Sequence, residues 1–462
     1  MRKTSATTSP LKNKLRAVGL VLAIITTISA SIYAIHHLAD SSTLFTTHEA
    51  YALAPVPVAT WDQLQQAITD AGTTPTTIQL TADIPSFATL LITSGADITL
   101  TGPHSLIANG NFPAITVQGT FTLDGLLITR QPSAPNANSR GVLVNSGGHL
   151  IFLSGQISGH AATSGGGINN NGTVTMKGGI ISNNTVPGSG GGVNNNGTFT
   201  MTGGSIENHT TTGHAAGVHN SAGATFNLDG GHIVNNHANA NGAGVFNNGT
   251  FNMTAGSISH NTSNHGMSAW GGTGVRVNQG TFTMSGGEIS HNTAFNGHGG
   301  GVESSGTFIM TGGYITQNHA HGNAGGIGAA GNTFLTSDVI SHNTATQQGG
   351  GISTNSPLVI GAGMRIEYNT ALLGGGIRTG NPSALNISES AIFRGNSASS
   401  THDYGLPAGL ASFPNIRWAG YTTGSNSIIG THLLNNFDIN FTGNLITAHT
   451  ATFKKDAPTI LR

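Results

Sequence analysis

Short alternations of apolar and polar residues recur along most of this chain, with glycine and asparagine between them. The stretch "GGGVNNNGTFTMTGGSIENHT" (residues 190–210) shows the unit: a glycine triplet, an apolar alternation, a Gly-Gly break and a final polar turn. The third position of the triplet recurs every 25 to 30 residues, at Gly167, Gly192, Gly217, Gly244, Gly274, Gly301, Gly326, Gly351 and Gly376. A fixed period of this length indicates a solenoid of stacked repeats.

Aligning the repeats places apolar residues in four columns. The first contains Phe121, Leu150, Val174, Phe199, Phe226, Phe251, Phe282, Phe308, Phe334, Leu358 and Leu385. The second lies two residues further on and includes Leu123, Phe152, Met176, Met201, Leu228, Met253, Met284 and Met310. The third runs from Ile128 to Phe393, and the fourth is the Ile or Val that follows each triplet, as in Ile168 and Val193. Because positions i and i+2 share one face of a strand, all four columns should point into one interior.

About 25 residues with three short strands make one turn of a parallel β-helix. Each strand would then pair with its counterpart in the next turn at about 4.8 Å. Glycine and asparagine suit the corners because they tolerate positive φ, and apolar residues fill the space between corners. We therefore expect an all-β, single-stranded parallel β-helix.

An asparagine column is the most regular polar feature. It stands three residues after the third apolar column, with His209 as the one exception that the alignment shows, at Asn184, Asn236, Asn261, Asn292, Asn318, Asn343, Asn369 and Asn396. Stacked amides can hydrogen-bond one another along a solenoid, so we expect a structural asparagine ladder. His260 and His291 precede this column in successive turns and should lie about one strand spacing apart.

The segments before and after the repeats have different predicted roles. Residues 1–35 contain a basic start and the uncharged segment 17–35, which predicts either a cleaved signal peptide or an uncleaved membrane anchor. We expect a linker at 36–59, a capping helix at 60–72, β-helix repeats at 73–396, and an insertion, final coil and C-terminal cap at 397–462. Either fate of the first segment leaves the repeats outside the cytoplasm, at the cell surface or secreted.

The composition of the chain argues against some classes of partner and cofactor. The chain has 462 residues, a formal net charge of −1, 7% charged residues and no cysteine. Five of its 16 Lys and Arg precede residue 17, so the body is mildly acidic and we expect no nucleic-acid partner. No disulfide can form, and no cofactor or metal motif is present, since Rossmann spacing and calcium-roll repeats are both missing.

The repeats also carry a family resemblance. The "GGGV" or "GGGI" motif followed by "IxxN", and "FRGN" (393–396) and "FTGN" (441–444), resembles the GGA[IV] and FxxN repeats of chlamydial polymorphic outer-membrane proteins. The unit "GTFTMSGG" is similar to repeats of many bacterial surface proteins with right-handed β-helices. The resemblance implies a right-handed β-helix displayed at a bacterial surface. Unlike the polymorphic proteins, this chain ends in "APTILR" without a run of barrel strands.

Catalysis is not expected. Pectate lyases and polygalacturonases resemble this architecture, but residues 150–396 contain no adjacent acidic pair and few basic residues. A polysaccharide-active enzyme therefore stays an alternative, as does a passive stalk without a specific ligand.

Binding is expected on the variable loops, because core and corner columns are fixed by packing. The longest loop, residues 263–272, contains Met267 and Trp270, which no core column requires. Phe295 and His298 lie in the next repeat and should fall on the same side, together with His319 and His321. We expect an adhesin-like, monomeric rod that contacts a host-surface protein or glycan through these residues.

Overall fold

The computed structural model describes residues 54–131, 138–264, 271–381, 384–388, 390–399 and 439–441. From Pro55 onward the described residues belong to one compact unit. The expected signal segment at 1–35 and most of the expected C-terminal cap lie outside the described residues. No helix within the described ranges is both long and apolar enough to cross a membrane.

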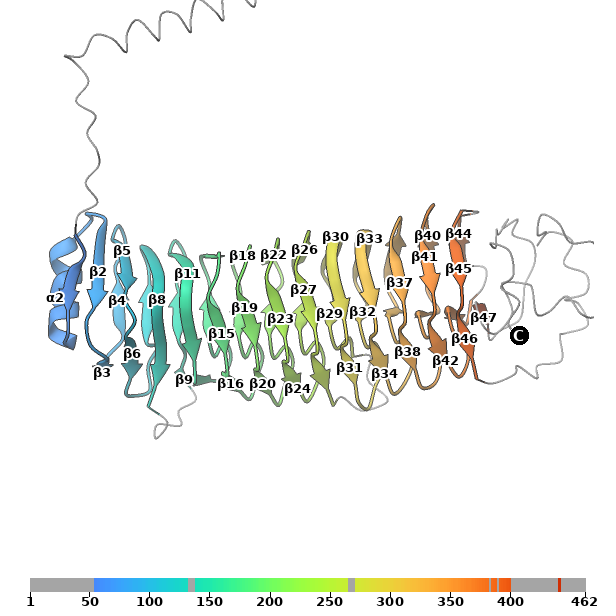
Figure 1. The fold of residues 1–462 in the computed structure, drawn as a ribbon, viewed down its shortest axis with the longest axis horizontal. Helices are drawn as coiled ribbons and strands as arrows, with labels where there is room; N and C mark the ends of the chain where they lie inside the picture. The colour runs from blue at the N-terminus through green and yellow to red at the C-terminus, as the bar shows by residue number, and fades with distance from the viewer. Residues whose placement is uncertain are drawn as a thin grey trace, which may run out of the picture. The chain divides into compact units, whose positions relative to one another are not determined.

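The described residues form a parallel β-solenoid of stacked coils with very little helix (Figure 1). One coil contains β17 (Val193–Asn195), β18 (Thr198–Met201), β19 (Ser205–Glu207) and β20 (Thr210–Thr211). In the described part of the chain these strands belong to three sheets of 23, 13 and 11 strands, here named sheets A, B and C. Sheet A takes two strands per coil, so a coil has four short strands instead of the expected three.

The bounds of the strands follow sheet by sheet. Sheet A comprises β1 (Val56–Val58), β2 (Thr76–Leu80), β3 (Ile84–Ser86), β5 (Asp97–Thr101), β6 (Ser105–Ala108), β8 (Thr120–Arg130), β11 (His149–Ser158), β14 (Thr173–Met176), β15 (Ile180–Ser182), β18, β19, β22 (Thr225–Leu228), β23 (His232–Val234), β26 (Thr250–Met253), β27 (Ser257–Ser259), β30 (Thr281–Ser290), β33 (Thr307–Thr316), β36 (Asn332–Leu335), β37 (Val339–Ser341), β40 (Leu358–Ile360), β41 (Arg365–Glu367), β44 (Leu385–Ile387) and β45 (Ile392–Arg394). Sheet B comprises β4 (Leu90–Ile92), β7 (Ile115–Val117), β10 (Val142–Val144), β13 (Ile168–Asn170), β17, β21 (Val218–Asn220), β25 (Val245–Asn247), β29 (Val275–Val277), β32 (Val302–Ser304), β35 (Ile327–Ala329), β39 (Ile352–Thr354), β43 (Ile377–Thr379) and β47 (Ile439–Phe441). Sheet C comprises β9 (Asn138–Ser139), β12 (Ala161–Ala162), β16 (Thr185–Val186), β20, β24 (His237–Ala238), β28 (Thr262–Ser263), β31 (Thr293–Ala294), β34 (His319–Ala320), β38 (Thr344–Ala345), β42 (Thr370–Ala371) and β46 (Ser397–Ala398).

The apolar columns line the interior almost as predicted. Equivalent residues pair in register, for example Phe199 with Phe226 and Met201 with Leu228, and both columns are buried. The phenylalanine rings stack face to face in the middle coils: the centroids of Phe251 and Phe282 are 4.5 Å apart at an interplanar angle of 7°. Stacked rings keep each coil in register with the next, because a slip of one residue would turn the whole column outward.

One member of the first column is wrong. Thr333, not Phe334, pairs with Phe308 and with Leu358, so Phe334 pairs with Ile309 and points outward. Thr333 is 1% exposed and Phe334 is 42% exposed. Counted from the corner glycine, Thr333 holds the position that Phe308 holds in the preceding coil. The corner glycine therefore sets the register of β36, even though this register places the apolar residue outside.

The glycine triplets are required for two different reasons. The first position has positive φ, as at Gly190 (71°) and Gly299 (70°), and Ala215 and Ala324 adopt the same conformation in two coils. The third position has no room for a side chain: a Cβ on Gly167 would lie 2.5 Å from Ile181 and 2.6 Å from the carbonyl oxygen of Gly192. Glycine thus turns the chain and also lets two backbones approach.

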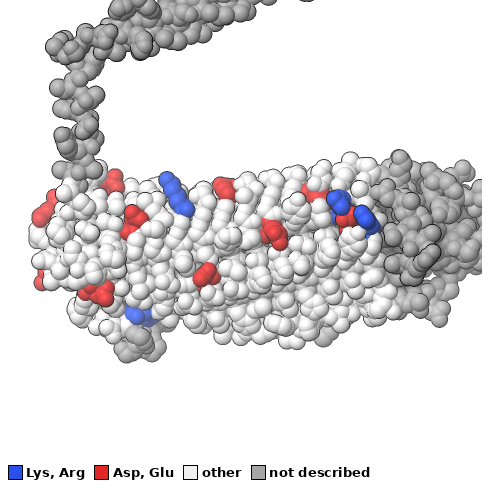
Figure 2. Space-filling model, viewed as in Figure 1, with Lys and Arg blue, Asp and Glu red and all other residues white. Residues whose placement is uncertain are grey.

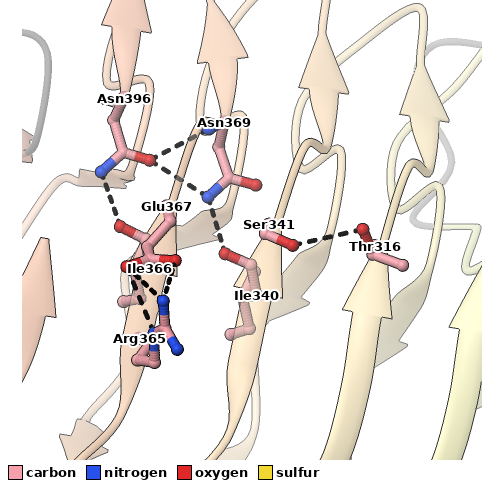
Figure 3. A network of polar contacts seen from close by, with 8 residues as sticks. All are labelled: Thr316, Ile340, Ser341, Arg365, Ile366, Glu367, Asn369 and Asn396. Carbon is pink, nitrogen blue, oxygen red and sulfur yellow. Dashed lines mark hydrogen bonds and ion pairs between the residues drawn. The ribbon is translucent and has the colours of Figure 1, made fainter. Parts of the chain in front are cut away.

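The asparagine ladder runs through the interior at the corner between sheets A and C (Figure 3). In each step, the backbone N–H and the side-chain Nδ2 of one asparagine donate to Oδ1 of the next, as Asn369 does to Asn396 at 3.1 Å each. The same Nδ2 also donates to a carbonyl of the preceding coil, here that of Ile340 at 2.8 Å. The buried amides therefore satisfy one another, as buried polar groups must.

A helix, α2 (Trp61–Ala71), stands at the N-terminal end of the solenoid, beside β2 and β3 (Figure 1). Thr60 is its N-cap and accepts from the backbone N–H of Gln63, while Gly72 closes it with φ of 55°. Leu64, Ile68 and Ala71 are buried against the core. Val56–Val58, which fell in the expected linker, form β1 and pair with β2 instead.

The chain leaves the regular coil at the corner between sheets C and B. The segment 264–274 follows β28 and precedes β29, and residues 399–438 lie between β46 and β47. β47 pairs in parallel with β43, with Ile439 opposite Ile377. We name this place the C–B corner.

Candidate functional site

The sequence-predicted loop residues fall partly at the C–B corner. Phe295 is 42% exposed, and its ring lies 6.0 Å from that of His321, edge to face. His321 in turn lies 4.9 Å from His319 of β34, again edge to face. These three residues form one outward cluster, here named the corner cluster. Met267 and Trp270 lie outside the described residues.

His298 is placed differently from Phe295. Its Nδ1 accepts a hydrogen bond from the backbone N–H of Asn323 at 2.8 Å, and its ring lies over Gly322 of the next coil. His214 makes the matching bond, accepting from the backbone N–H of Asn241 at 3.1 Å. Both imidazoles therefore tie one C–B corner to the next, and His298 has a structural partner in addition to any role in binding.

The outward residues of sheet B form a second group of polar side chains that sequence reasoning missed. The middle residue of each strand faces away from the core, and in β21, β25, β29 and β32 these are His219, Phe246, Arg276 and Glu303. The Phe246 ring lies 5.0 Å from that of His214 and 5.7 Å from that of His219. Burial lowers the pKa of His214 and of His219, each with a smaller contribution from a neighbouring cationic group.

Arg276 and Glu303 are an unusual pair because both are buried. Arg276 Nη1 lies 3.8 Å from Glu303 Oε1, and the two residues are 7% and 0% exposed. Neither carboxylate oxygen of Glu303 has a hydrogen-bond partner among the described residues, and burial raises the pKa of this carboxyl to about 8. At neutral pH the group is therefore largely protonated, despite the opposing effect of the nearby guanidinium.

Gly328 makes room for the Glu303 carboxyl. A Cβ at this position would lie 1.6 Å from Glu303 Oε2. The carboxyl therefore occupies the space in which the next coil would otherwise place its outward side chain. Only the spatial pairing of β32 with β35 reveals this dependence, because the two residues lie 25 positions apart in the sequence.

The first strand that each middle coil contributes to sheet A presents regular rows of uncharged polar groups outward. In the strands β14, β18, β22, β26, β30 and β33 the first outward residue is always threonine: Thr173, Thr198, Thr225, Thr250, Thr281 and Thr307. Among the described residues, none of these six hydroxyls bonds another protein group. The second outward position holds Thr175, Thr200, Asn227, Asn252, Thr283 and Ile309. Figure 2 shows one face of the solenoid, on which a few acidic and basic side chains stand in a mostly uncharged surface.

A second, shorter asparagine ladder fixes the backbone of these threonines. Asn170, Asn195, Asn220 and Asn247 are buried, and each of the first three donates to the side chain of the next at 2.7 to 2.8 Å. Their Nδ2 groups also donate to the backbone carbonyls of Thr198, Thr225, Thr250 and Thr281. Hydrogen bonds from inside the solenoid thus fix the backbone of four of these threonines.

The register of β36 breaks the polar character of sheet A. It exposes Phe334 between two apolar neighbours in the same outward row, Ile309 and Val359. It also buries the hydroxyl of Thr333 without a hydrogen-bond partner, which costs about 1–3 kcal/mol. Tyr314 of β33 and its partner Val339 of β37 extend the apolar surface, and Tyr314 is 56% exposed. We name Ile309, Phe334, Val359, Tyr314 and Val339 the β36 patch.

The acidic residues of the described coils lie apart from one another and do not share partners. Glu367 pairs with Arg365 at 2.9 Å (Figure 3), and Asp229 accepts from the hydroxyl of Thr254 at 2.7 Å. Asp338 is buried at the bend of sheet A, where desolvation raises its pKa to about 7. Within the part of the chain that the structure describes, no three His, Cys, Asp or Glu side chains are grouped to hold a metal ion.

Comparisons with known proteins add no assignment: no family model, no curated protein and no solved structure matches this chain.

Proposed function

We propose that the protein is an exported, surface-displayed β-helix rod that binds a ligand without transforming it, in the manner of a bacterial adhesin. The apolar segment 17–35 supports export, either by a cleaved signal or as an anchor. Right-handed winding is expected from the twist of parallel strands and their connections. The helix α2 would cap the first coil and keep its strand edges from pairing with other chains.

The corner cluster is the observation that carries the proposal. Phe295, His319 and His321 gather at the C–B corner, where the chain also leaves the coil for its longest excursions. Exposed aromatic and imidazole rings have both a flat apolar face and a polar edge, and such side chains are favoured in contact surfaces. A host-surface protein or glycan would contact this corner, with Met267 and Trp270 contributed by the long loop.

The test is adhesion of the double variant Phe295→Ala/His321→Ala. Because both side chains lie at the surface, we expect binding to host cells or arrayed glycans to fall at least tenfold with an unchanged melting temperature. Phe87→Ala is the matched control, since Phe87 is 65% exposed and lies at the N-terminal end, far from the cluster. Equal adhesion of both variants and the wild type would favour the passive stalk.

A polysaccharide-active enzyme is the second candidate, favoured by the raised pKa of Glu303 and Asp338. Glu303 lies on β32 of sheet B and Asp338 lies between β36 and β37 of sheet A, which weakens a joint acid and base role. Release of reducing ends from polysaccharides, lost in Glu303→Gln, would establish this activity and overturn the binding proposal.

A further inference from the structure

We infer that the β36 patch is a binding site for a neutral oligosaccharide, which would lie across the outer face of sheet A. This inference rests on the proposed binding function but assigns it a second site, separate from the corner cluster. The carrying observation is the register of β36, which places a phenylalanine outside and a threonine inside.

The register that the corner sets buries Leu335, but it also presents Phe334 to solvent and leaves the Thr333 hydroxyl buried and unpaired. Exchanging the residues at 333 and 334 would keep Leu335 inside and return a phenylalanine to the column of Phe308. A local arrangement that opposes both burial rules is characteristic of functional positions. The exposed ring is also not isolated, because Ile309 and Val359 flank it in the same row.

The surroundings of the ring match the chemistry of a sugar. A pyranose has an apolar face of C–H groups and a rim of hydroxyls, so it needs a flat ring beneath it and neutral hydrogen-bonding groups at its edge. Phe334 provides the ring, and Thr307, Thr283 and the exposed Asn332 provide hydroxyl and amide groups on the same and adjacent strands. Tyr314 provides a second exposed ring with its own hydroxyl.

Charge and spacing favour a neutral, extended ligand. The β36 patch and the outward threonine rows beside it contain no Lys, Arg, Asp or Glu. Charged residues begin one coil away, with Glu288 opposite Tyr314 and with Arg365, which is paired with Glu367, opposite Val339. Equivalent side chains on successive coils repeat at about 4.8 Å, so the face offers hydrogen-bonding groups at regular intervals along the rod.

The experiment compares three variants of the full chain with cellohexaose, chitohexaose, mannohexaose and maltohexaose by isothermal titration calorimetry. We expect at least one of the four to bind the wild type, and Phe334→Ala to weaken that binding at least tenfold. Phe87→Ala should bind as the wild type does, because it removes a still more exposed ring elsewhere.

The decisive variant is the exchange Thr333→Phe/Phe334→Thr. It returns a phenylalanine to the core column, so we expect the melting temperature to rise while oligosaccharide binding is lost. A patch with only a structural role would not show this opposite response. Absence of binding to all four hexasaccharides, or undiminished binding by the exchange variant, would overturn the inference. Adhesion tests of the corner cluster are independent of this outcome.

Discussion

Asparagine and histidine perform the same task at the corner between sheets A and C. His209 replaces an asparagine in the ladder: its Nδ1 accepts from the backbone N–H of Asn184, and its Nε2 lies 3.0 Å from the carbonyl oxygen of Ile181. His160 holds the equivalent position two coils earlier, and its Nε2 lies 3.1 Å from the carbonyl oxygen of Ile128. Both imidazoles are fully buried, and desolvation lowers the pKa of each to about 4.

These histidines each contribute a loss of stability in mild acid. The unfolded chain protonates them as the pH falls below about 6.5, whereas the folded chain does so only near pH 4, so their contribution to the free energy of unfolding decreases between these values. The slope should be about 1.4 kcal/mol per pH unit for each histidine, and the raised pKa values of Glu303 and Asp338 act in the opposite direction. Urea midpoints of the wild type and of His209→Asn at pH 7.5 and pH 5 isolate the contribution of His209. The variant should gain stability relative to the wild type as the pH falls, and an unchanged difference between the two proteins would contradict the assignment.

A second prediction at this scale concerns Gly328. Gly328→Ala would force its new methyl group against the Glu303 carboxyl, so it should destabilise the protein by about 1–3 kcal/mol. In a Glu303→Ala background the same substitution should cost less, because the occupied space is then empty. A double-mutant cycle on thermal unfolding measures the coupling, and additive effects would show that the two residues do not meet.

The third prediction concerns the longer asparagine ladder, at the corner between sheets A and C. Asn292→Ala would leave the backbone N–H and the side chain of Asn261, and the carbonyl of Ile258, without their buried partners. We expect a loss of about 3 kcal/mol or more. Asn292→His should be tolerated better, since His160 and His209 already make the corresponding contacts in two coils. Denaturant unfolding of both variants tests this order of stability.

The helix α2 gives the fourth prediction. Deleting residues 60–72 would uncover Val58 and Ile78, which are buried at the first coil, and free the edge of β1. Exposed strand edges template pairing between chains, so the deletion should cause aggregation, which light scattering detects. A deletion variant that stays monomeric would show that another segment protects this end.

The repeated columns could be predicted from the sequence, whereas the positions that depart from them could not. Regular columns were visible because the same residue type returns in many coils, and the stacked rings of His260 and His291, 4.8 Å apart, agree with the expected spacing. Phe334 was assigned to the wrong face because hydrophobicity alone does not show where a corner restarts the register. His160 was missed because it was not an asparagine, and the Arg276–Glu303 pair depends on which side chains face outward from neighbouring strands.

At the scale of the molecule, stability should vary along the stack. Each central coil is bonded to two neighbours, whereas the terminal coils have one, so local opening should begin at the ends. Hydrogen exchange followed by mass spectrometry should therefore show the strongest protection in the coils with stacked phenylalanines, from Phe226 to Phe308. Uniform protection from β2 to β45 would instead indicate that the solenoid unfolds as a single unit.

The C–B corner gives the solenoid a route to new functions. Forty residues separate β46 from β47 in the sequence, and β47 nevertheless pairs in parallel with β43, so this pairing tolerates a long intervening segment. The entropy cost of closing a loop grows only slowly with its length. Foreign peptides inserted after β31 or β34 should consequently leave the coils folded, and natural selection could diversify this corner while the asparagine ladders stay unchanged.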